Sequence, residues 1–377
     1  MTIAHLISSG GYYGAECMLM TLVQALTRLN SRCVVGVLDD ARFHHLEIAE
    51  EAAKRGIEVK TFPCRGRFDH SAITAIRRWL AALRPEVLHT HGYKADLYGR
   101  LARSGSIPPV LAATCHNWPD PALLMRLYAS LDRIALRHFD VVAAVSPQVL
   151  AAVQRSGVKH AKYVPNGVEI ESFICADPPH RQASDGAGRE AFVGFAGRLV
   201  PDKGGAELLQ AARRVVAERS KTRFVFAGDG GCLRPWKDLA AQLGISEDVL
   251  FLGRWREMAA FYSALDVFVL PSKIEAMPMT VIEAMASGVP VVASRVGAIP
   301  DVVVAGETGI LVEPGDVDGI AAAILQLLSD DALARRLSEQ GRKYVTQTLT
   351  SDVMARSYLT MYQQALTRTS AGRYSNS

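Results

Sequence analysis

The sequence predicts an α/β protein with two doubly wound domains. Short apolar runs such as IAHLI, CVVGVL and VVAAVS recur through its first half, and AFVGFAG, RFVFAGDG and VFVLPS follow in the second. Longer amphipathic segments separate these runs, an alternation that is typical of repeated βαβ units around a parallel sheet. The 377 residues exceed the roughly 250–300 over which one hydrophobic core grows, which favours two domains.

The predicted boundaries follow from local composition. Residues 174–190, ICADPPHRQASDGAGRE, are rich in Pro, Gly, Asp and Ser and predict an interdomain linker or a long surface loop. We therefore expect an N-terminal domain over residues 1–175 and a C-terminal domain over 190–350. A helical pattern over 351–368 is expected to pack back toward the first domain, and the polar residues 369–377 to form a flexible tail.

Composition and charge exclude several classes of protein. With 49% hydrophobic and 21% charged residues, the chain is neither disordered nor fibrous. A formal charge of +4 and a pI of about 8.7 are too diffuse to predict nucleic-acid binding, although they suit phosphorylated substrates or an anionic membrane face. The six cysteines form no C-x-x-C pair, so we expect no zinc site, no disulfide framework and a cytoplasmic location. No uncharged apolar run approaches the ~20 residues that span a bilayer, which limits membrane contact to the periphery.

Polar residues directly after apolar strands are the first site candidates, because open α/β sheets bind ligands at the carboxyl ends of their strands. Glu275 and Glu283 lie eight positions apart within PSKIEAMPMTVIEAMASGVPVVAS, one of the most apolar stretches. Glu275 is expected in the loop after VFVLPS, and Glu283 one to two turns into a helix that begins near Pro278. Two uncompensated carboxylates would be costly there, so a polyhydroxylated ligand is the expected partner.

Two further features of the second half predict anion binding. The first turn of the predicted helix comprises Met277, Pro278, Met279, Thr280 and Val281. Its backbone N–H groups would be free to bind an anion such as phosphate. Arg198 and Lys203 follow FVGFAG and precede two glycines, so their cations would converge on a negative leaving group.

The first half offers weaker candidates. Its first strand runs into SSGGYYGAE, whose glycines would let the backbone approach a phosphate at Gly14 or, as substitutes, at Gly10 and Gly11. His116 ends the strand in ATCHNW, and Asn166 stands in the PNG turn after another strand.

Asp316 and Asp318 mimic a metal-binding D-x-D pair. An N-cap explains Asp316 better, because a helix-forming run follows Pro and Gly there. We therefore assign no metal and no other cofactor.

The stretch 271–294 resembles the signature of retaining glycosyltransferases with the GT-B architecture, the large family 4. VGAIPDVV continues the match, FVGFAGRLVPDKG resembles the diphosphate-binding segment, and YVPNGVE resembles the segment that leads into the interdomain region. YGAE, VLHTHGY and ATCHNW match more weakly, and Tyr13 stands where the family usually has the first of two adjacent glycines. The resemblance implies two Rossmann-like domains that face each other across a cleft, the first binding the acceptor and the second the nucleotide-sugar.

The resemblance also implies roles. Glu275 would contact hydroxyls of the donor sugar, Glu283 the ribose, and His116 would lie beside the reaction centre. His89 and His91 would line the cleft in a structural role. The residues expected to act in catalysis are His116, Arg198, Lys203 and Glu275. The expected substrate-binding residues are Gly11, Gly14, Asn166, Arg254, Met277, Pro278, Met279, Thr280 and Glu283.

The predicted function is metal-independent, retaining transfer of a sugar from a nucleotide-diphosphate sugar to a hydroxyl of a carbohydrate or lipid-linked acceptor, in glycan, polysaccharide or glycolipid synthesis. Alternatives are a sugar-nucleotide-binding protein without transferase activity, or an epimerase or phosphorylase on the same plan. A dehydrogenase is disfavoured because the first turn lacks G-x-G-x-x-G. The basic amphipathic segments AITAIRRWLAALR and LLMRLYASLDRIALRHF suit either peripheral contact with an anionic membrane or ordinary packed helices.

Overall fold

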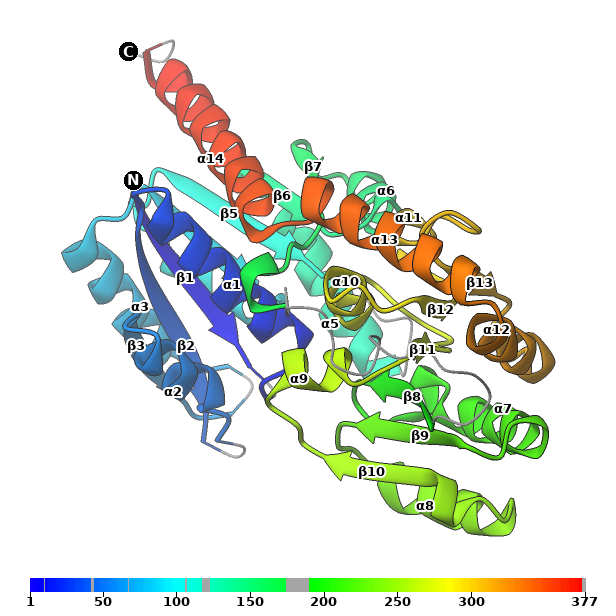
Figure 1. Cartoon of the computed structure of the whole chain (residues 1–377). Helices are drawn as coiled ribbons and strands as arrows, with labels where there is room; N and C mark the ends of the chain where they lie inside the picture. Colours follow the sequence, from blue (N-terminus) through cyan, green and yellow to red (C-terminus); the bar gives the residue numbers. More distant parts are fainter. Residues whose placement is uncertain are drawn as a thin grey trace. The chain divides into compact units, whose positions relative to one another are not determined.

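The structure, a computed structural model, divides the chain into two compact units, Met1–Gly167 with Ser351–Ser377, and Val168–Thr350 (Figure 1). The structure describes the whole chain except residues 10, 42–43, 67, 106, 117–122, 174–189 and 375–377. For residues 123–129 and 372–374 it describes the backbone but not the side chains. The predicted linker therefore lies outside the described residues except for Glu190.

The division of the chain falls at Gly167 rather than at residue 175. The N–H of Val168 donates to the carbonyl of Leu349 at 2.9 Å, and Val168 forms a β-bridge with Thr350. These contacts tie the chain to the second unit before the linker composition begins. Composition alone misplaced the boundary because 168–173 carry no turn-rich signal.

The first unit is built on a parallel sheet in the order β3-β2-β1-β4-β5-β6-β7. Its strands are β1 (Thr2–Ser8), β2 (Arg32–Asp40), β3 (Glu58–Cys64), β4 (Val87–His91), β5 (Val110–Cys115), β6 (Val141–Ala144) and β7 (Ala161–Tyr163). Every residue of β4 and β5 is buried, as expected for parallel strands covered on both faces. The strand order reverses between β1 and β4, the switch point where such sheets bind ligands.

Helices cover both faces of this sheet (Figure 1). They are α1 (Gly14–Arg28), α2 (Glu47–Lys54), α3 (His70–Leu83), α4 (Tyr93–Ala102), α5 (Leu123–Leu136), α6 (Pro147–Arg155) and α14 (Ser351–Tyr374). α3 begins where the Asp69 carboxylate accepts the N–H of Ser71 at 2.8 Å. Ile73, Ile76 and Leu80 of α3 are buried, so this basic amphipathic segment is a packed helix of the core.

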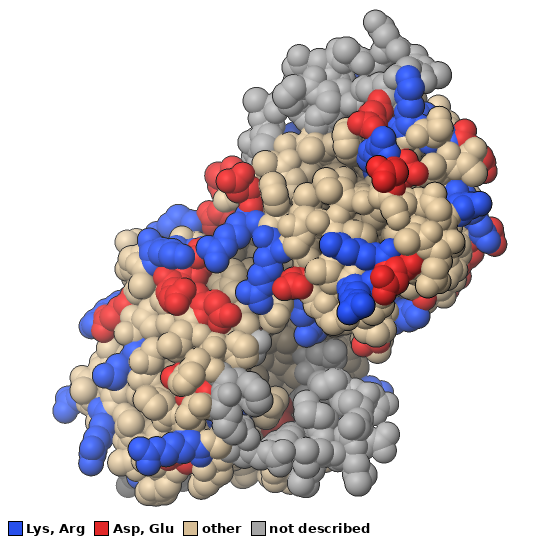
Figure 2. Space-filling model, turned by 90° about the horizontal axis from the view of Figure 1, so that it is seen from below, with Lys and Arg blue, Asp and Glu red and all other residues tan. Residues whose placement is uncertain are grey.

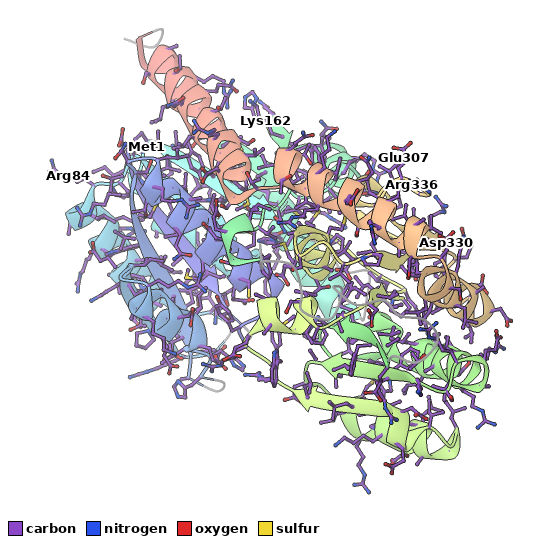
Figure 3. The ribbon with its side chains drawn as sticks, in the orientation of Figure 1. Met1, Arg84, Lys162, Glu307, Asp330 and Arg336 are labelled. Carbon is purple, nitrogen blue, oxygen red and sulfur yellow. The ribbon has the colours of Figure 1, made fainter. Side chains whose placement is uncertain are left out.

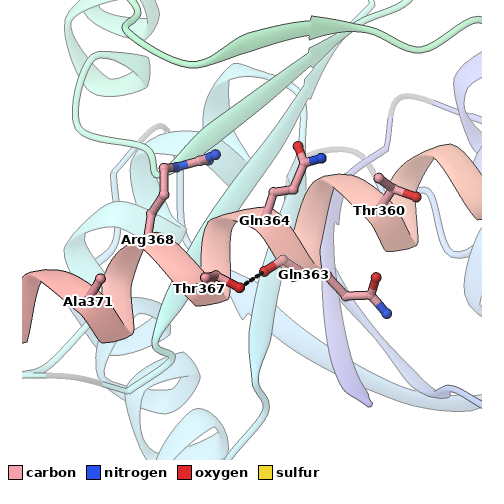
Figure 4. A pocket seen from close by; sticks show the side chains of 6 residues that line it. All are labelled: Thr360, Gln363, Gln364, Thr367, Arg368 and Ala371. Carbon is pink, nitrogen blue, oxygen red and sulfur yellow. Dashed lines mark hydrogen bonds between the residues drawn. The ribbon is translucent and has the colours of Figure 1, made fainter.

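The C-terminal helix α14 belongs to the first unit, where it packs on α1 and β5. It continues to Tyr374, past the helix end expected at 368 and into the expected tail, where residues 369–374 contain no proline that would end a helix. Six side chains of this helix line a pocket, and Figure 4 shows them from close by. They are Thr360, Gln363, Gln364, Thr367, Arg368 and Ala371. These helix-surface side chains contribute no catalytic constellation.

The second unit has a parallel sheet in the order β10-β9-β8-β11-β12-β13. Its strands are β8 (Ala191–Ala196), β9 (Thr222–Ala227), β10 (Val249–Gly253), β11 (Val267–Leu270), β12 (Val291–Ser294) and β13 (Ile310–Val312). Its α-helices are α7 (Gly205–Glu218), α8 (Leu233–Gln242), α9 (Met258–Ser263), α10 (Met279–Ala286), α11 (Ile299–Val302), α12 (Val317–Ser329) and α13 (Asp331–Thr348). The order here reverses between β8 and β11.

Helix α13 is fixed at its start and along its side. Asp330 caps it by accepting the N–H of Leu333 at 2.9 Å, and Nη1 of Arg336 donates to the carbonyl of Gly306 at 3.0 Å, beside Glu307 (Figure 3). The cap and the arginine hold α13 against the turn that precedes β13.

Surface charge is mixed. On the face shown in Figure 2, Lys and Arg side chains are interspersed with Asp and Glu. Within the part of the chain that the structure describes, no helix combines the length and apolarity needed to cross a bilayer.

Candidate active site

The reversal point of the second sheet brings Lys203 and Glu275 together. Lys203 ends the 3₁₀ turn Pro201–Lys203 after β8, and Glu275 lies in the loop after the neighbouring β11. Nζ of Lys203 lies 2.5 Å from Oε2 of Glu275, with side chains 20% and 10% exposed. The hydroxyl of Ser272 donates to the same oxygen at 3.2 Å. Two residues predicted from separate motifs thus share one site.

Glycines permit these loops to approach so closely. Gly204 has φ +71°, and a Cβ there would lie 1.9 Å from the carbonyl oxygen of Pro271. Gly297, after β12, has φ +52°, and its Cβ would lie 1.6 Å from the carbonyl oxygen of Glu275. Any side chain at either position would push the Glu275 loop out of place. Sequence analysis missed Gly297, although the motif VGAIP contains it.

Glu283 receives a hydrogen bond that sequence analysis did not foresee. It lies on α10, and the hydroxyl of Tyr262 on α9 donates to its Oε2 at 2.8 Å. Burial raises the pKa of Glu283 to about 7, and the Tyr262 hydrogen bond opposes that rise. The carboxyl group can therefore gain or lose a proton near neutral pH.

The first turn of α10 differs from expectation. Pro278 precedes the helix rather than opening it, and Met277 is buried. The N–H of Met279 donates to the Met277 carbonyl at 3.1 Å, and that of Val281 to the Pro278 carbonyl at 3.1 Å. These tight local turns engage two of the donors that were expected to be free.

Arg198 and Arg254 are exposed at the same carboxyl edge, after β8 and β10 respectively. The Arg198 loop is packed against the loop after β9, since a Cβ at Gly230 would lie 2.4 Å from the Leu199 carbonyl oxygen. The carboxyl edge of the second sheet therefore carries Arg198 and Arg254 as well as Lys203.

In the first unit, His116 follows β5 at the carboxyl edge. Burial lowers its pKa to about 4, so its imidazole is neutral at physiological pH. Among the described residues, none forms a hydrogen bond with its Nε2. A neutral imidazole with an available nitrogen can accept or relay a proton.

A buried histidine cluster lies beside His116. The ring centroids of His91 and His116 are 6.1 Å apart, and Nδ1 of His5 lies 3.2 Å from Nε2 of His91. Both nitrogens of His89 are engaged, by the Thr114 hydroxyl at 2.7 Å and by a hydroxyl of α14, that of Tyr362, at 2.6 Å. His89 and His91 are buried, so neither lines a surface, and among the described residues none forms a hydrogen bond with Nδ1 of His91 or Nε2 of His5.

Burial keeps this cluster neutral. It lowers the pKa of His5 to about 3 and those of His89 and His91 well below 6.5. Sequence analysis did not single out His5, because only the pairing of β1 with β4 brings it beside His89 and His91.

Comparison with known proteins then decides the family. The profile "Glycosyl transferase 4-like domain" matches residues 14–167, and "Glycosyl transferases group 1" matches 177–344. The GDP-mannose-dependent α-(1-6)-phosphatidylinositol monomannoside mannosyltransferase of Mycolicibacterium smegmatis is 30% identical over 79% of this chain and 82% of its own length. The chain belongs to family 4 of the GT-B glycosyltransferases.

Two other relatives of this family 4 member are matched over a smaller fraction of their own length. The N-acetyl-α-D-glucosaminyl L-malate synthase of Bacillus anthracis is 34% identical over 63% of each chain. The sulfoquinovosyl transferase SQD2 of Arabidopsis thaliana is 27% identical over 74% of this chain and 58% of its own. The chain thus spans less than two thirds of these two relatives.

Solved structures confirm the GT-B fold. Anabaena HepE in complex with UDP and glucose superposes with a TM-score of 0.82 at 21% identity, covering 97% of this chain and all of HepE. The sucrose-phosphate synthase of Thermosynechococcus elongatus superposes with a TM-score of 0.81 at 22% identity, covering 98% of this chain and all of the synthase.

The N-terminal loop of the family 4 member departs from the expected glycine site. Gly14 opens α1, but a Cβ at Gly11 (φ +133°) would lie 2.5 Å from the ring of Tyr13. The aromatic ring thus covers the backbone at Gly11. Glu16 caps α1 by accepting the N–H of Tyr13 at 3.1 Å. Gly10 lies outside the described residues.

Among the remaining candidates, Asp316 and Asp318 have local explanations, whereas no described residue forms a hydrogen bond with the buried Oδ1 of Asn166. Asn166 is buried in the first unit, between β7 and the unit's end. Asp316 caps α12 by accepting the N–H of Gly319 at 2.9 Å, which confirms the predicted cap. Asp318 pairs with Arg214. The D-x-D motif is thus engaged in capping and in a surface ion pair.

The Gly297 contact generates a stability prediction. Gly297→Ala adds left-handed strain of about 1–2 kcal/mol and a clash with the Glu275 carbonyl. Gly306→Ala, at φ +76° with open space around its Cβ, adds the strain alone. We expect thermal unfolding midpoints to fall in both variants, and to fall further in Gly297→Ala. Equal shifts would contradict the close approach.

The histidine cluster generates a pH prediction. Because its folded pKa values lie below the ordinary 6.5, the cluster supports folding above pH 6.5 and loses that support as pH falls toward about 3. We expect urea stability to decline between pH 7 and pH 5, and His91→Gln to flatten this decline. The matched variant of an exposed histidine, His138→Gln, should keep the wild-type slope. An unchanged slope in His91→Gln would refute the assignment.

Proposed function

We propose that this protein is a retaining, metal-independent glycosyltransferase that moves a sugar from a nucleotide-diphosphate sugar to a hydroxyl acceptor. The observation that carries the proposal is the Lys203–Glu275 pair at the reversal point of the second sheet. A cation for phosphate and a carboxylate for sugar hydroxyls lie side by side there, as a sugar attached to a diphosphate requires.

Lys203 and Glu275 are suited to stabilise the departure of the nucleoside diphosphate from the sugar. When the bond from the sugar to the diphosphate breaks, negative charge develops on the phosphate oxygen, and Lys203 with Arg198 would stabilise that charge. Glu275, held by Ser272 and by the contact at Gly297, would accept hydrogen bonds from the sugar hydroxyls. Two cations supply the charge that a metal ion provides in other transferases, which supports a metal-independent reaction.

Glu283 would accept hydrogen bonds from the ribose of the nucleotide. Vicinal hydroxyls favour the ionised carboxylate, whose pKa is raised to about 7 before ligand binds. Tyr262 orients the carboxyl group by its hydrogen bond to Oε2. Arg254 would lie toward the base, and the first turn of α10 toward the phosphates.

His116 would act on the acceptor side. Its neutral imidazole could receive the proton of the attacking hydroxyl or pass it to the leaving phosphate. Attack from the face that the diphosphate leaves would keep the anomeric configuration. Seven residues lie between the two glutamates, in a stretch that resembles the signature of the retaining enzymes of the family, and this resemblance supports the proposed stereochemistry.

The acceptor is proposed to be a carbohydrate or a lipid-linked carbohydrate, reached from the cytoplasm, with peripheral membrane contact where the acceptor is lipid-linked. Two relatives carry names of mannosyltransferases that act on phosphatidylinositol mannosides, and one carries the name of a capsular polysaccharide glycosyltransferase. These names support synthesis of glycan, glycolipid or polysaccharide as the setting.

Removing either member of the pair should slow catalysis strongly while leaving the fold intact. We expect Glu275→Gln and Lys203→Met to lower nucleoside-diphosphate release from a panel of UDP-, GDP- and ADP-sugars by on the order of 10²–10³-fold. Lys273→Met, which removes a neighbouring ion pair with Glu207, should stay near wild type. EDTA should leave the rate unchanged.

The outcomes of that assay separate the proposal from its alternatives. Tight donor binding without release would favour a silent binding protein, and an epimerised donor without acceptor transfer would favour an epimerase. Full activity in Glu275→Gln would contradict the proposed site.

Glu283 predicts proton release on nucleotide binding. Ribose hydroxyls lower its pKa from about 7, so binding at pH 7 should release roughly half a proton, and affinity should weaken as pH falls below 7. Calorimetry of UDP, GDP and ADP binding in buffers of different ionisation enthalpy measures this release. Glu283→Gln should abolish it, whereas Glu307→Gln should not. Release that persists in Glu283→Gln would assign the proton elsewhere.

A further inference from the structure

The chain enters the second unit through a short anchored stretch, Val168–Phe173, which we call the entry segment. Its start is fixed because the N–H of Val168 donates to the carbonyl of Leu349 at 2.9 Å. A 3₁₀ turn follows, after which the N–H of Phe173 donates to the carbonyl of Ile170 at 2.9 Å. The side chain of Ile170 is buried. These contacts give Phe173 a defined position at the end of the entry segment.

The side chain of Phe173 packs on Tyr262. The two rings meet edge to face, with centroids 6.0 Å apart and planes at 61°. Tyr262 lies on α9 and is fully buried, and Phe268 of β11 packs edge to face on the same ring at 5.5 Å. Edge-to-face pairs stabilise the position of a ring beyond what burial of its surface contributes. The Tyr262 ring is therefore restrained from the entry segment as well as from the sheet.

Tyr262 in turn holds a carboxyl group. Its hydroxyl on α9 donates to Oε2 of Glu283 on α10 at 2.8 Å. Burial raises the pKa of Glu283 to about 7, and this hydrogen bond opposes the rise. α13, β11 and β12 also pack on α10, but among the described residues no charged side chain on them shifts that pKa. The ionisation of Glu283 therefore depends on its burial and on Tyr262.

We propose that Phe173 is a positioning residue for nucleotide binding, which holds Tyr262 so that the Tyr262 hydroxyl holds Glu283 in place for the ribose. The proposal rests on the transferase function proposed above and extends its nucleotide site to the entry segment. Phe173 acts through Tyr262 and not on the nucleotide itself. Because coupling between two sites is reciprocal, a contact that strengthens nucleotide binding is itself strengthened when the nucleotide binds.

Nucleotide binding to Phe173→Ala tests the proposal. Without the ring, Tyr262 loses one restraint and its hydrogen bond to Glu283 weakens, so the pKa of Glu283 rises further and more of the carboxyl is protonated at pH 7. We expect UDP, GDP or ADP, whichever binds, to bind about two- to tenfold more weakly at pH 7. Calorimetry in buffers of different ionisation enthalpy should show proton release that rises above the roughly half proton expected of wild type.

Three further variants make the test specific. Tyr262→Phe removes only the hydroxyl, so it should raise proton release as Phe173→Ala does, and it keeps the test available where Phe173→Ala does not fold. Phe173→Tyr keeps the ring and should behave as wild type does. Phe192→Ala removes a half-buried ring at the amino end of β8, away from the carboxyl edge, and should leave proton release unchanged.

Hydrogen exchange measures the reciprocal effect. The amides of Val168 and Phe173 are both hydrogen-bonded, so their exchange reports the opening of the entry segment. Exchange at both amides should slow when nucleotide binds to wild type, and should slow less in Tyr262→Phe at the same saturation.

The outcomes separate this proposal from the proposed function. Normal nucleoside-diphosphate release from donor sugars, with proton release unchanged in both Phe173→Ala and Tyr262→Phe, would overturn the positioning role alone. So would equal losses of affinity in Phe173→Ala and Phe192→Ala without a change in proton release, since Phe173 would then contribute only packing. The expected pattern of nucleotide binding without donor turnover would support the positioning role and overturn the transferase. Failure of all three nucleotides to bind wild type would overturn both.

Discussion

The close approach of the loops after β8, β11 and β12 is the constraint on which the second unit's site depends. Gly204 and Gly297 leave no room for a Cβ against the carbonyls of Pro271 and Glu275, so backbone meets backbone at both contacts. That packing fixes Glu275 within reach of Lys203. The geometry of the site therefore depends on Gly204 and Gly297, which lack side chains, as much as on the charged residues.

Much of the fold and half of the site could be predicted from sequence, because both follow local patterns. Alternating apolar runs predicted the strands of both sheets, and the strand-end rule selected Lys203 and Glu275. The pairing of these two residues agrees with that rule, since β8 and β11 are neighbours at the reversal of strand order. The division at Gly167 could not be predicted, because it depends on hydrogen bonding between Val168 and Leu349, which are remote in sequence.

The features that the sequence did not predict share one physical cause: they depend on contacts between residues that are remote in sequence. His89 and Tyr362 are 273 positions apart, and the sequence around either residue does not indicate that the two form a hydrogen bond. Tyr262 donates a hydrogen bond to Glu283 from a different helix, and burial of the Glu283 carboxyl in the folded chain raises its pKa to about 7. Tyr13 was noted as a departure from a glycine pattern, but its ring position over Gly11 depends on the turn itself.

The placement of α14 in the first unit has a consequence for anyone who recombines enzymes of this architecture. The hydroxyls of Tyr358 and Tyr362 complete the bonding of Thr114 and His89 inside the first unit. A chimaera that exchanges everything after residue 167 would therefore replace α14, which packs on the core of the first unit, with the corresponding helix of another enzyme. A workable exchange must transplant 168–350 as an inserted cassette and keep both ends of the recipient chain.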